Sequence, residues 1–372
     1  MGIDDGNIGT SKWELDTPAL IVDLAAMERN LQKMAGYFAG RTVNLRPHVK
    51  TYNATPVLAQ MQLEAGAQGL TCAKLSEAEV LAAAGIKDIL IANQVVGPKK
   101  IQRLVNLASY TDIMVAVDNY ENVEALSHAA YQHGVSIRVL VEVNIGHNRC
   151  GVTPFDSTLS LSRTVIGAPG LKYSGLMGYD GHCTMRVDEI ERAEKSREAN
   201  TLLVENRRFI EAAGIEVPIV SGSGTFTYRF AGEIDGITEI QAGTYLLMDT
   251  TFREMGVREF ELTLSVMTTV ISRASYPIEV DQAVIDTGRK SVSPLLGLPE
   301  VKHPQGAEVI ALNQEHGKVA LDVGLQGLKV GDKIELWVRD ANCTINLFNK
   351  IYGVRDDIVE TIWEIPLSGV ST

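Results

Sequence analysis

The sequence predicts an α/β fold: a (β/α)8 TIM barrel followed by a β-rich C-terminal domain. Short, almost continuous apolar runs alternate with helical patterns between about residues 42 and 243. Parallel strands covered on both faces have this pattern, and eight β/α units of this length match the usual size of the barrel. From about residue 256, strand patterns and turn signals follow one another with little helix between them. A doubly wound parallel sheet is the alternative fold.

The barrel strands are expected where apolar and β-branched residues cluster. These positions are residues 42–48, 69–74, 88–94, 112–118, 136–144, 171–181, 217–224 and 237–243. Helical patterns separate most of them, at residues 55–66, 76–85, 98–109, 119–134 and 188–213. The helix after the seventh strand is expected to be short.

Three parts follow from this pattern. Residues 1–30 are an N-terminal segment whose strand "ALIVDL" is expected to pair with the C-terminal domain, residues 31–255 are the barrel, and residues 256–372 are the β-rich domain. Strands of the last part are expected at residues 261–276, 282–288, 308–321, 332–338 and 344–365.

The amino-acid composition and the net charge argue against some classes of function. Of the 372 residues, 45% are hydrophobic and 22% charged, which is ordinary for a soluble globular protein. The net charge of −12 argues against nucleic acid as a partner, because phosphate neutralisation requires clustered Lys and Arg. No apolar run is long enough to span a membrane, and no signal pattern opens the chain. The four cysteines form no CxxC pair and are expected to be free thiols in a cytoplasmic protein.

Polar residues gather at the ends of the predicted strands, where (β/α)8 barrels carry their chemistry. They are Lys50, Lys74, Asn93, Asp118, Asn144 with Arg149, Tyr179 with His182, Ser221 to Thr225, and Gly243 with Thr244. If the fold is a barrel, these side chains converge on one mouth.

Two of these strand ends have the composition of a phosphate cradle. "SGSGT" (Ser221, Gly222, Ser223, Gly224, Thr225) follows strand seven and "AGT" (with Gly243 and Thr244) follows strand eight. Glycines let backbone N–H groups approach a phosphate, and hydroxyls add donors. Lys50 is then either a surface lysine or an amine that forms a Schiff base with a carbonyl. The lysine and the two loops together suggest pyridoxal 5′-phosphate (PLP).

The same stretches resemble the D-threonine aldolase / D-serine dehydratase family of fold-type III PLP enzymes, which are related to alanine racemase at the barrel. The resemblance covers about residues 13–365. It rests on "LDTPALIVDL", "RPHVKT", "KLSEAEVLAAAGIKDILIANQ", "EVNIGHNRCGV", "GLMGYDGH", "VSGSGT", "QAGTYLLMD", "IDTGRKSVS", "EHG" and "TINLF".

The resemblance implies a role for each part of the mouth. Lys50 is expected to form the Schiff base, Arg149 to lie beside the cofactor ring, and Tyr179 to lie near the pyridine nitrogen. The loops at 221–225 and 243–244 are expected to hold the phosphate. Family members complete their active site at a dimer contact, so a homodimer is expected.

Two histidines are candidates for proton transfer. His48 precedes Lys50 by two residues and points the same way if the segment is extended; it is a base, a ring partner or only a satisfied pocket histidine. His182 follows "GYDG" and is a candidate proton shuttle for the substrate hydroxyl, or a loop histidine.

The expected metal ligands of the family are altered. Family members carry a His-x-Cys or His-x-Asp pair where alignment on "TINL" places Asp340 and Asn342. Oxygen ligands suit Mg²⁺ or Mn²⁺ better than Zn²⁺. A shift of one residue puts Arg339 at the first position, which favours no metal.

The resemblance implies a PLP-dependent lyase that cleaves D-configured β-hydroxy-α-amino acids into an aldehyde and glycine or another small amino acid. The alternative is β-elimination from D-serine or D-3-hydroxyaspartate, which gives a 2-oxo acid and ammonia. A racemase and a non-catalytic PLP-binding protein are further alternatives.

Overall fold

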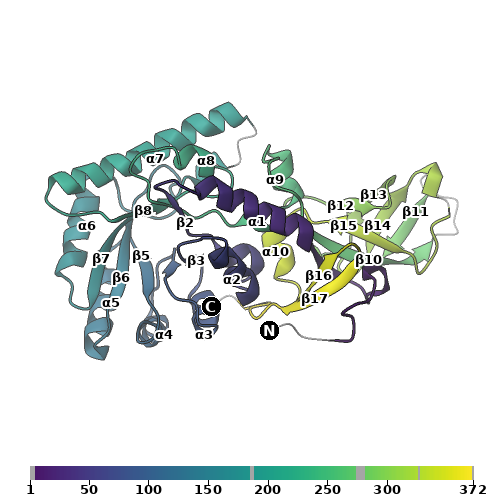
Figure 1. Ribbon diagram of the computed structural model, residues 1–372, viewed down its shortest axis with the longest axis horizontal. Helices are drawn as coiled ribbons and strands as arrows, with labels where there is room; N and C mark the ends of the chain where they lie inside the picture. The colour runs from purple at the N-terminus through teal and green to yellow at the C-terminus, as the bar shows by residue number, and fades with distance from the viewer. Residues whose placement is uncertain (1–4, 185–187, 274–280, 326, 371–372) are drawn as a thin grey trace. The chain divides into compact units, whose positions relative to one another are not determined.

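The computed structural model describes residues 5–184, 188–273, 281–325 and 327–370, and it divides into two compact units (Figure 1). The barrel unit comprises Met34–Lys50 and Leu58–Thr244. The second unit, here called the strand-rich unit, comprises residues 5–33, Thr51–Val57 and Tyr245–Gly369.

Eight strands form the sheet of the barrel unit, in the order β2-β9-β8-β7-β6-β5-β4-β3, and every neighbouring pair is parallel. The strands are β2 (Asn44–Leu45), β3 (Leu70–Cys72), β4 (Ile89–Ile91), β5 (Ile113–Val117), β6 (Ile137–Glu142), β7 (Leu171–Gly178), β8 (Ile219–Gly222) and β9 (Glu239–Ile240). Each lies within one of the eight predicted positions, so the prediction of a parallel barrel is confirmed.

The two ends of this sheet are joined by backbone hydrogen bonds. Gln68 N donates to Leu45 O (2.9 Å), and Thr71 N donates to Pro47 O (2.9 Å). A parallel bridge also links His48 to Thr71. The sheet therefore closes on itself, unlike the open doubly wound alternative.

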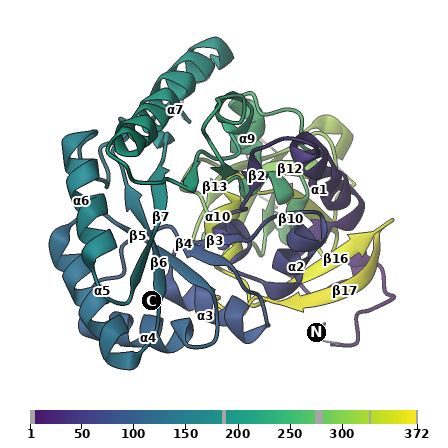
Figure 2. The same cartoon turned by 60° about the vertical axis from the view of Figure 1, so that its left-hand side comes forward.

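Apolar strands and capped helices explain the local structure of the barrel. All five residues of β5 are buried, as expected for a strand covered on both faces. The helices are α2 (Pro56–Glu64), α3 (Leu75–Ala83), α4 (Pro98–Ala108), α5 (Tyr120–His133), α6 (Asp156–Gly167), α7 (Glu189–Ala212) and the short α8 (Tyr228–Ala231). Asn119 caps α5 by accepting from Asn122 N (2.8 Å), and Gly134 ends it with φ 65°. Figure 2 shows α4, α5 and α6 along the outer side of the strands.

The strand-rich unit is built on a nine-stranded sheet. Its strands are β1 (Ala19–Asp23), β10 (Leu264–Arg273), β11 (Gln282–Ile285), β12 (Glu300–His303), β13 (Ala307–Leu312), β14 (Gly317–Leu321), β15 (Lys333–Trp337), β16 (Lys350–Arg355) and β17 (Ile358–Glu364). β1, from the N-terminal segment, lies between β10, which is antiparallel to it, and β16, which is parallel to it. Buried side chains of β1, β10, β16 and β17 pack into one apolar cluster.

Two sequence expectations for this unit need correction. The segment over 344–365, where strand was expected, begins within helix α10 (Ala341–Ile345), because Asp340 caps this helix by accepting from Cys343 N (3.1 Å). β12 was not expected, and residues 274–276 of the strand expected over 261–276 lie outside the described residues. The remaining helices are α1 (Leu24–Phe38) and α9 (Thr250–Glu254).

Of the helices that the structure describes, none combines the length and the apolar composition that a membrane crossing requires.

Candidate active site

Lys50 follows β2, within the 3-10 turn η2 (Val49–Tyr52). Surrounding protein lowers the pKa of its amine, the positive charge of Arg149 lowers it further, and Glu77 opposes both effects. The side chain nevertheless remains accessible to solvent. An accessible amine with a lowered pKa is more often neutral, which is the form that attacks a carbonyl.

His48 lies beside the lysine on the same segment. Because residues 49–52 form a 3-10 turn, the segment is not extended, and the strand alternation expected for His48 and Lys50 does not apply. Burial holds the pKa of His48 well below its usual range, and the charges of Lys50 and Arg149 lower it further. The imidazole is therefore neutral at pH 7.

Arg149 connects this segment to Tyr179, which follows β7. Its guanidinium carbon lies 5.3 Å from the centre of the Tyr179 ring, a cation–π contact. Burial, together with the charge of Asp180, raises the pKa of Tyr179 to about 12, although Arg149 opposes the change. The phenol is therefore protonated at neutral pH and available as a hydrogen-bond donor.

Two histidines extend the site from Tyr179. The edge of the His147 ring meets Tyr179 at a centroid distance of 5.5 Å, and the His147 and His182 rings stack 6.4 Å apart. His182 Nδ1 is buried and has no hydrogen-bond partner among the described residues. A groove of about 870 Å³ is lined by His182, the loop after β6 and α7. Reasoning from the sequence did not select His147, although it lies within "EVNIGHNRCGV".

The Ser221–Thr225 loop lies next to Tyr179. A Cβ built on Gly224 would have Tyr179 Cε2 as its nearest neighbour, 3.8 Å away. Ser223 is in the left-handed region at φ 59°, and its Oγ donates to Asp180 Oδ2 (2.9 Å). Ser221 Oγ accepts from Gln241 Nε2 (3.0 Å). The hydroxyls of Ser221 and Ser223 are therefore already engaged by protein groups.

At Gly243, the backbone that follows β9 packs closely against the segment that contains His48 and Lys50. A Cβ at this position would lie 2.1 Å from the carbonyl oxygen of His48, so only glycine fits. Thr244, the next residue, is buried. Lys50, Arg149, Tyr179 and His182 are thus linked through neighbouring charges and ring contacts, with His147 between the last two.

A second polar cluster was largely missed. Asp118, Glu142 and Cys150 place one potential ligand atom each within 4.8 Å of one another. Gly151 N donates to Asp118 (3.1 Å), and Gln94 Nε2 donates to Glu142 (2.6 Å). Burial raises the pKa of Glu142, while Gln94 and the charge of Arg149 oppose this rise. Of these three residues, only Asp118 was selected from the sequence, as a strand-end residue.

Comparisons with known proteins show the family of this chain. The alanine racemase N-terminal domain model matches residues 22–251, and a serine dehydratase domain model matches residues 263–354. A D-threonine aldolase from Arthrobacter sp. is 37% identical over 96% of this chain and 94% of its own length. The chain belongs to the D-threonine aldolase family.

Other members of the family differ in substrate and reaction. A 3-hydroxy-D-aspartate aldolase from Paracoccus denitrificans is 34% identical over 97% of this chain and 94% of its own. A D-threo-3-hydroxyaspartate dehydratase from Delftia sp. is 31% identical over 87% of this chain and 89% of its own. The crystal structure of D-threonine aldolase from Filomicrobium marinum superimposes with a TM-score of 0.93 at 35% identity, covering all of both chains.

Asp340 and Asn342, the two residues that the sequence analysis expects at the metal-ligand positions, lie in the strand-rich unit. Asp340 is buried, and its Oδ1 accepts from Cys343 N (3.1 Å), while Ser293 Oγ lies 3.5 Å from Oδ2. Asn342 Oδ1 is buried without a hydrogen-bond partner among the described residues. Burial raises the pKa of nearby Asp249 to about 6, and the charge of Asp340 adds to this rise.

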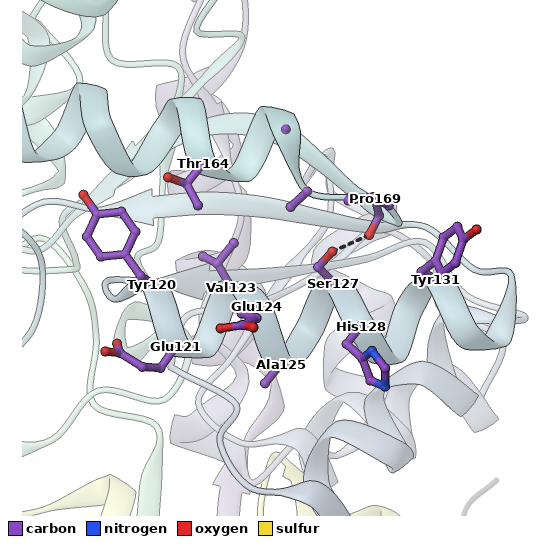
Figure 3. A pocket seen from close by; sticks show the side chains of 12 residues that line it. Tyr120, Glu121, Val123, Glu124, Ala125, Ser127, His128, Tyr131, Thr164 and Pro169 are labelled. Atoms are coloured by element: carbon purple, nitrogen blue, oxygen red, sulfur yellow. Dashed lines mark hydrogen bonds between the residues drawn. The ribbon is translucent and has the colours of Figure 1, made fainter.

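A groove of about 840 Å³ lies on the outer surface of the barrel unit (Figure 3). It lies between α5 and α6, with Tyr120 and Tyr131 among its lining residues. Ser127 Oγ donates to Pro169 O (2.7 Å) across it. None of its lining residues belongs to the predicted site.

Proposed function

We propose that this protein is a PLP-dependent lyase that cleaves D-configured β-hydroxy-α-amino acids into an aldehyde and glycine or another small amino acid. One observation carries the proposal: the accessible amine of Lys50, with its lowered pKa, lies in the same cluster as Arg149 and Tyr179. The names of the relatives supply the substrate class.

The chemistry of the mouth fits PLP. Lys50 is the amine that would bind the aldehyde group. In the Ser221–Thr225 loop, Ser223 has a left-handed backbone conformation. It is followed by Gly224, which has no side chain to keep a phosphate away from the backbone. Loops of this kind direct backbone N–H groups toward an anion. Arg149 and Tyr179 would flank the ring, one as a fixed positive charge and the other as a neutral phenol.

When bound, PLP supplies the electron sink for the pair released as a bond to Cα breaks. The protein must hold the substrate so that the Cα–Cβ bond is the one that breaks. A base takes the β-hydroxyl proton, the hydroxyl-bearing carbon leaves as an aldehyde, and Cα later receives a proton to give the amino acid product. The atoms balance with no further reactant.

His182 is the better candidate for this base. The lowered pKa of His48 makes its imidazole a weak proton acceptor. His182 instead has an unpartnered ring nitrogen and lines a groove. We assign the β-hydroxyl proton to His182 and a ring-contact role to His48.

β-Elimination is the second candidate, because a dehydratase of 3-hydroxyaspartate is 31% identical to this chain. In that reaction the Cα proton is removed and the hydroxyl leaves. The two reactions are distinguished by incubating the PLP-loaded protein with D-threonine, D-phenylserine and D-serine. Aldehyde with glycine supports the proposal, and 2-oxo acid with ammonia supports dehydration. A change in chirality alone indicates a racemase, and no turnover of any substrate contradicts a lyase.

A weakly held divalent cation completes the proposal. The unpartnered oxygen of Asn342 and the carboxylate of Asp340 are hard oxygen donors, which suit Mg²⁺ or Mn²⁺. A variant of the related dehydratase has been solved in a metal-free form (TM-score 0.87, 28% identity, covering 95% of this chain and 98% of its own). The capping bond from Cys343 N occupies part of the Asp340 carboxylate, so binding is expected to be loose.

A further inference from the structure

Asp180 lies between Tyr179 and the 3-10 turn η3 (Gly181–Cys183), and its side chain is completely buried. Its Oδ2 accepts from Ser196 Oγ (2.7 Å), Asn200 Nδ2 (3.0 Å) and Ser223 Oγ (2.9 Å). Its Oδ1 accepts from Thr227 Oγ1 (3.2 Å). Four neutral donors therefore surround one buried carboxylate.

These four bonds tie two parts of the barrel together. Ser196 and Asn200 belong to α7, a helix of 24 residues, whereas Ser223 and Thr227 belong to the segment between β8 and α8. A buried carboxylate is tolerated only when hydrogen bonds replace its hydration, so all four partners are held to it. The loop that follows β8 is thereby fixed to a long helix.

The conformation of this loop requires such support. Ser223 lies at φ 59°, a region that residues with a Cβ rarely adopt and that persists only when the surroundings hold it. Each hydroxyl has a single proton, and Asp180 accepts those of both Ser223 and Thr227. Thr227 Oγ1 is then free to accept from Gly224 N, which lies 3.4 Å away.

We infer that Asp180 is the positioning residue of the phosphate-binding loop, holding Ser221–Thr225 in the shape that accepts a phosphate monoester. It acts through Ser223 and Thr227 and does not itself touch the phosphate. The inference rests on the proposed function, because it takes the ligand of this loop to be the phosphate of PLP.

This role predicts that a change at Asp180 weakens only the part of the binding affinity that the phosphate group contributes. Pyridoxal has the ring and aldehyde of PLP but no phosphate, so it isolates the contribution of the loop. The dissociation constants of PLP and pyridoxal are measured by absorption titration for the wild type, Asp180→Asn and Thr227→Val. In both variants the PLP constant is expected to rise about tenfold or more, while the pyridoxal constant stays within about twofold.

Ser196→Ala is the matched control. It removes a hydroxyl donor to the same carboxylate oxygen, but from α7 instead of the loop, and should leave the preference for PLP over pyridoxal unchanged. Thr227→Val keeps the side-chain shape and provides the test if Asp180→Asn does not fold.

The outcomes separate the two proposals. Equal weakening of PLP and pyridoxal, or no change in either, overturns the role of Asp180 while the wild type still binds PLP. A wild type that binds PLP no better than pyridoxal contradicts the phosphate site itself, and with it both proposals.

Discussion

Arg46 is one of the two arginines that are the largest fully buried side chains among the described residues, and its removal tests how the barrel is held together. Its Nε and Nη2 donate to the two carboxylate oxygens of Glu239 at 2.9 and 2.7 Å. Nη1 and Nη2 also donate to the backbone and side chain of Asp88, each at 3.0 Å. These bonds link the segment after β2 to β9 on one side and to the residue before β4 on the other.

Arg46→Met removes the guanidinium but retains most of the apolar volume. The side chains of Arg46 and Glu239 are 0% and 2% exposed, so the variant leaves a buried carboxylate without its cation. Breaking a buried pair in this way costs about 3–5 kcal/mol. For a unit of this size, that corresponds to a fall of about 6–20 °C in the unfolding midpoint.

Thermal unfolding followed by circular dichroism, supported by urea titration, measures the effect. Arg103→Met is the matched control, because Arg103 makes a similar two-bond pair with Glu79 (2.8 and 2.5 Å) in the same unit. The side chains of Arg103 and Glu79 are 35% and 33% exposed, so water screens their charges. The expected loss of stability in Arg103→Met is therefore about 1 kcal/mol or less.

The double variant Arg46→Met/Glu239→Leu tests whether the unpaired carboxylate of Glu239 causes the loss of stability. It leaves no unpaired charge at this position and should recover most of the lost stability, since apolar groups of similar volume often replace a buried pair without loss. Equal destabilisation by Arg46→Met and Arg103→Met would refute the reasoning. So would a double variant no more stable than Arg46→Met alone.

Four further predictions follow from the site and its surroundings. Lys50→Ala should abolish the visible absorption of lysine-bound PLP, and an unchanged spectrum would contradict the assignment of Lys50. Because burial raises the pKa of Asp249 to about 6 from 3.8, the folded state holds a proton that the unfolded chain releases. Stability should therefore fall by about 2 kcal/mol as the pH rises from 4 to 6, and Asp249→Asn should flatten that slope in urea titrations. EDTA should reduce activity, Mg²⁺ or Mn²⁺ should restore it better than Zn²⁺, and full activity with no metal by elemental analysis would exclude a role for Asp340 and Asn342. Light scattering should show a homodimer, against which a fully active monomer would count.

Much of the barrel follows from local sequence. A strand buried on both faces is largely apolar, so most of the eight strands are visible as apolar runs, although the two-residue strands β2 and β9 each contain a polar residue, Asn44 and Glu239. Because parallel strands end at the same edge of the sheet, residues as distant in sequence as Lys50 and Thr244 could be assigned to one mouth. The glycine at 243 was recognised as part of a loop, but the reason for it, the His48 carbonyl 2.1 Å from a built Cβ, appears only in the folded chain.

Other features were decided by tertiary structure. The segment after Asp340 has strand-like composition, yet the capping carboxylate begins a short helix there. The turn at 49–52 interrupts the expected alternation of His48 and Lys50. Neither outcome follows from hydrophobic periodicity, because short polar caps and turns override it.

Asp180 shows most clearly what could not be predicted from the sequence. The letters "GYDG" stand at the end of the strand expected over residues 171–181, but the four donors to the Asp180 carboxylate lie 16 to 47 positions further along the chain. A hydrogen-bond network of this kind has no period and no fixed spacing, since it depends on where a helix and a loop meet. The sequence by itself determined where the strands of the barrel lie and predicted the end at which polar side chains gather. Only the folded chain determined which polar side chains hold one another in place, because those bonds join segments that come together only on folding.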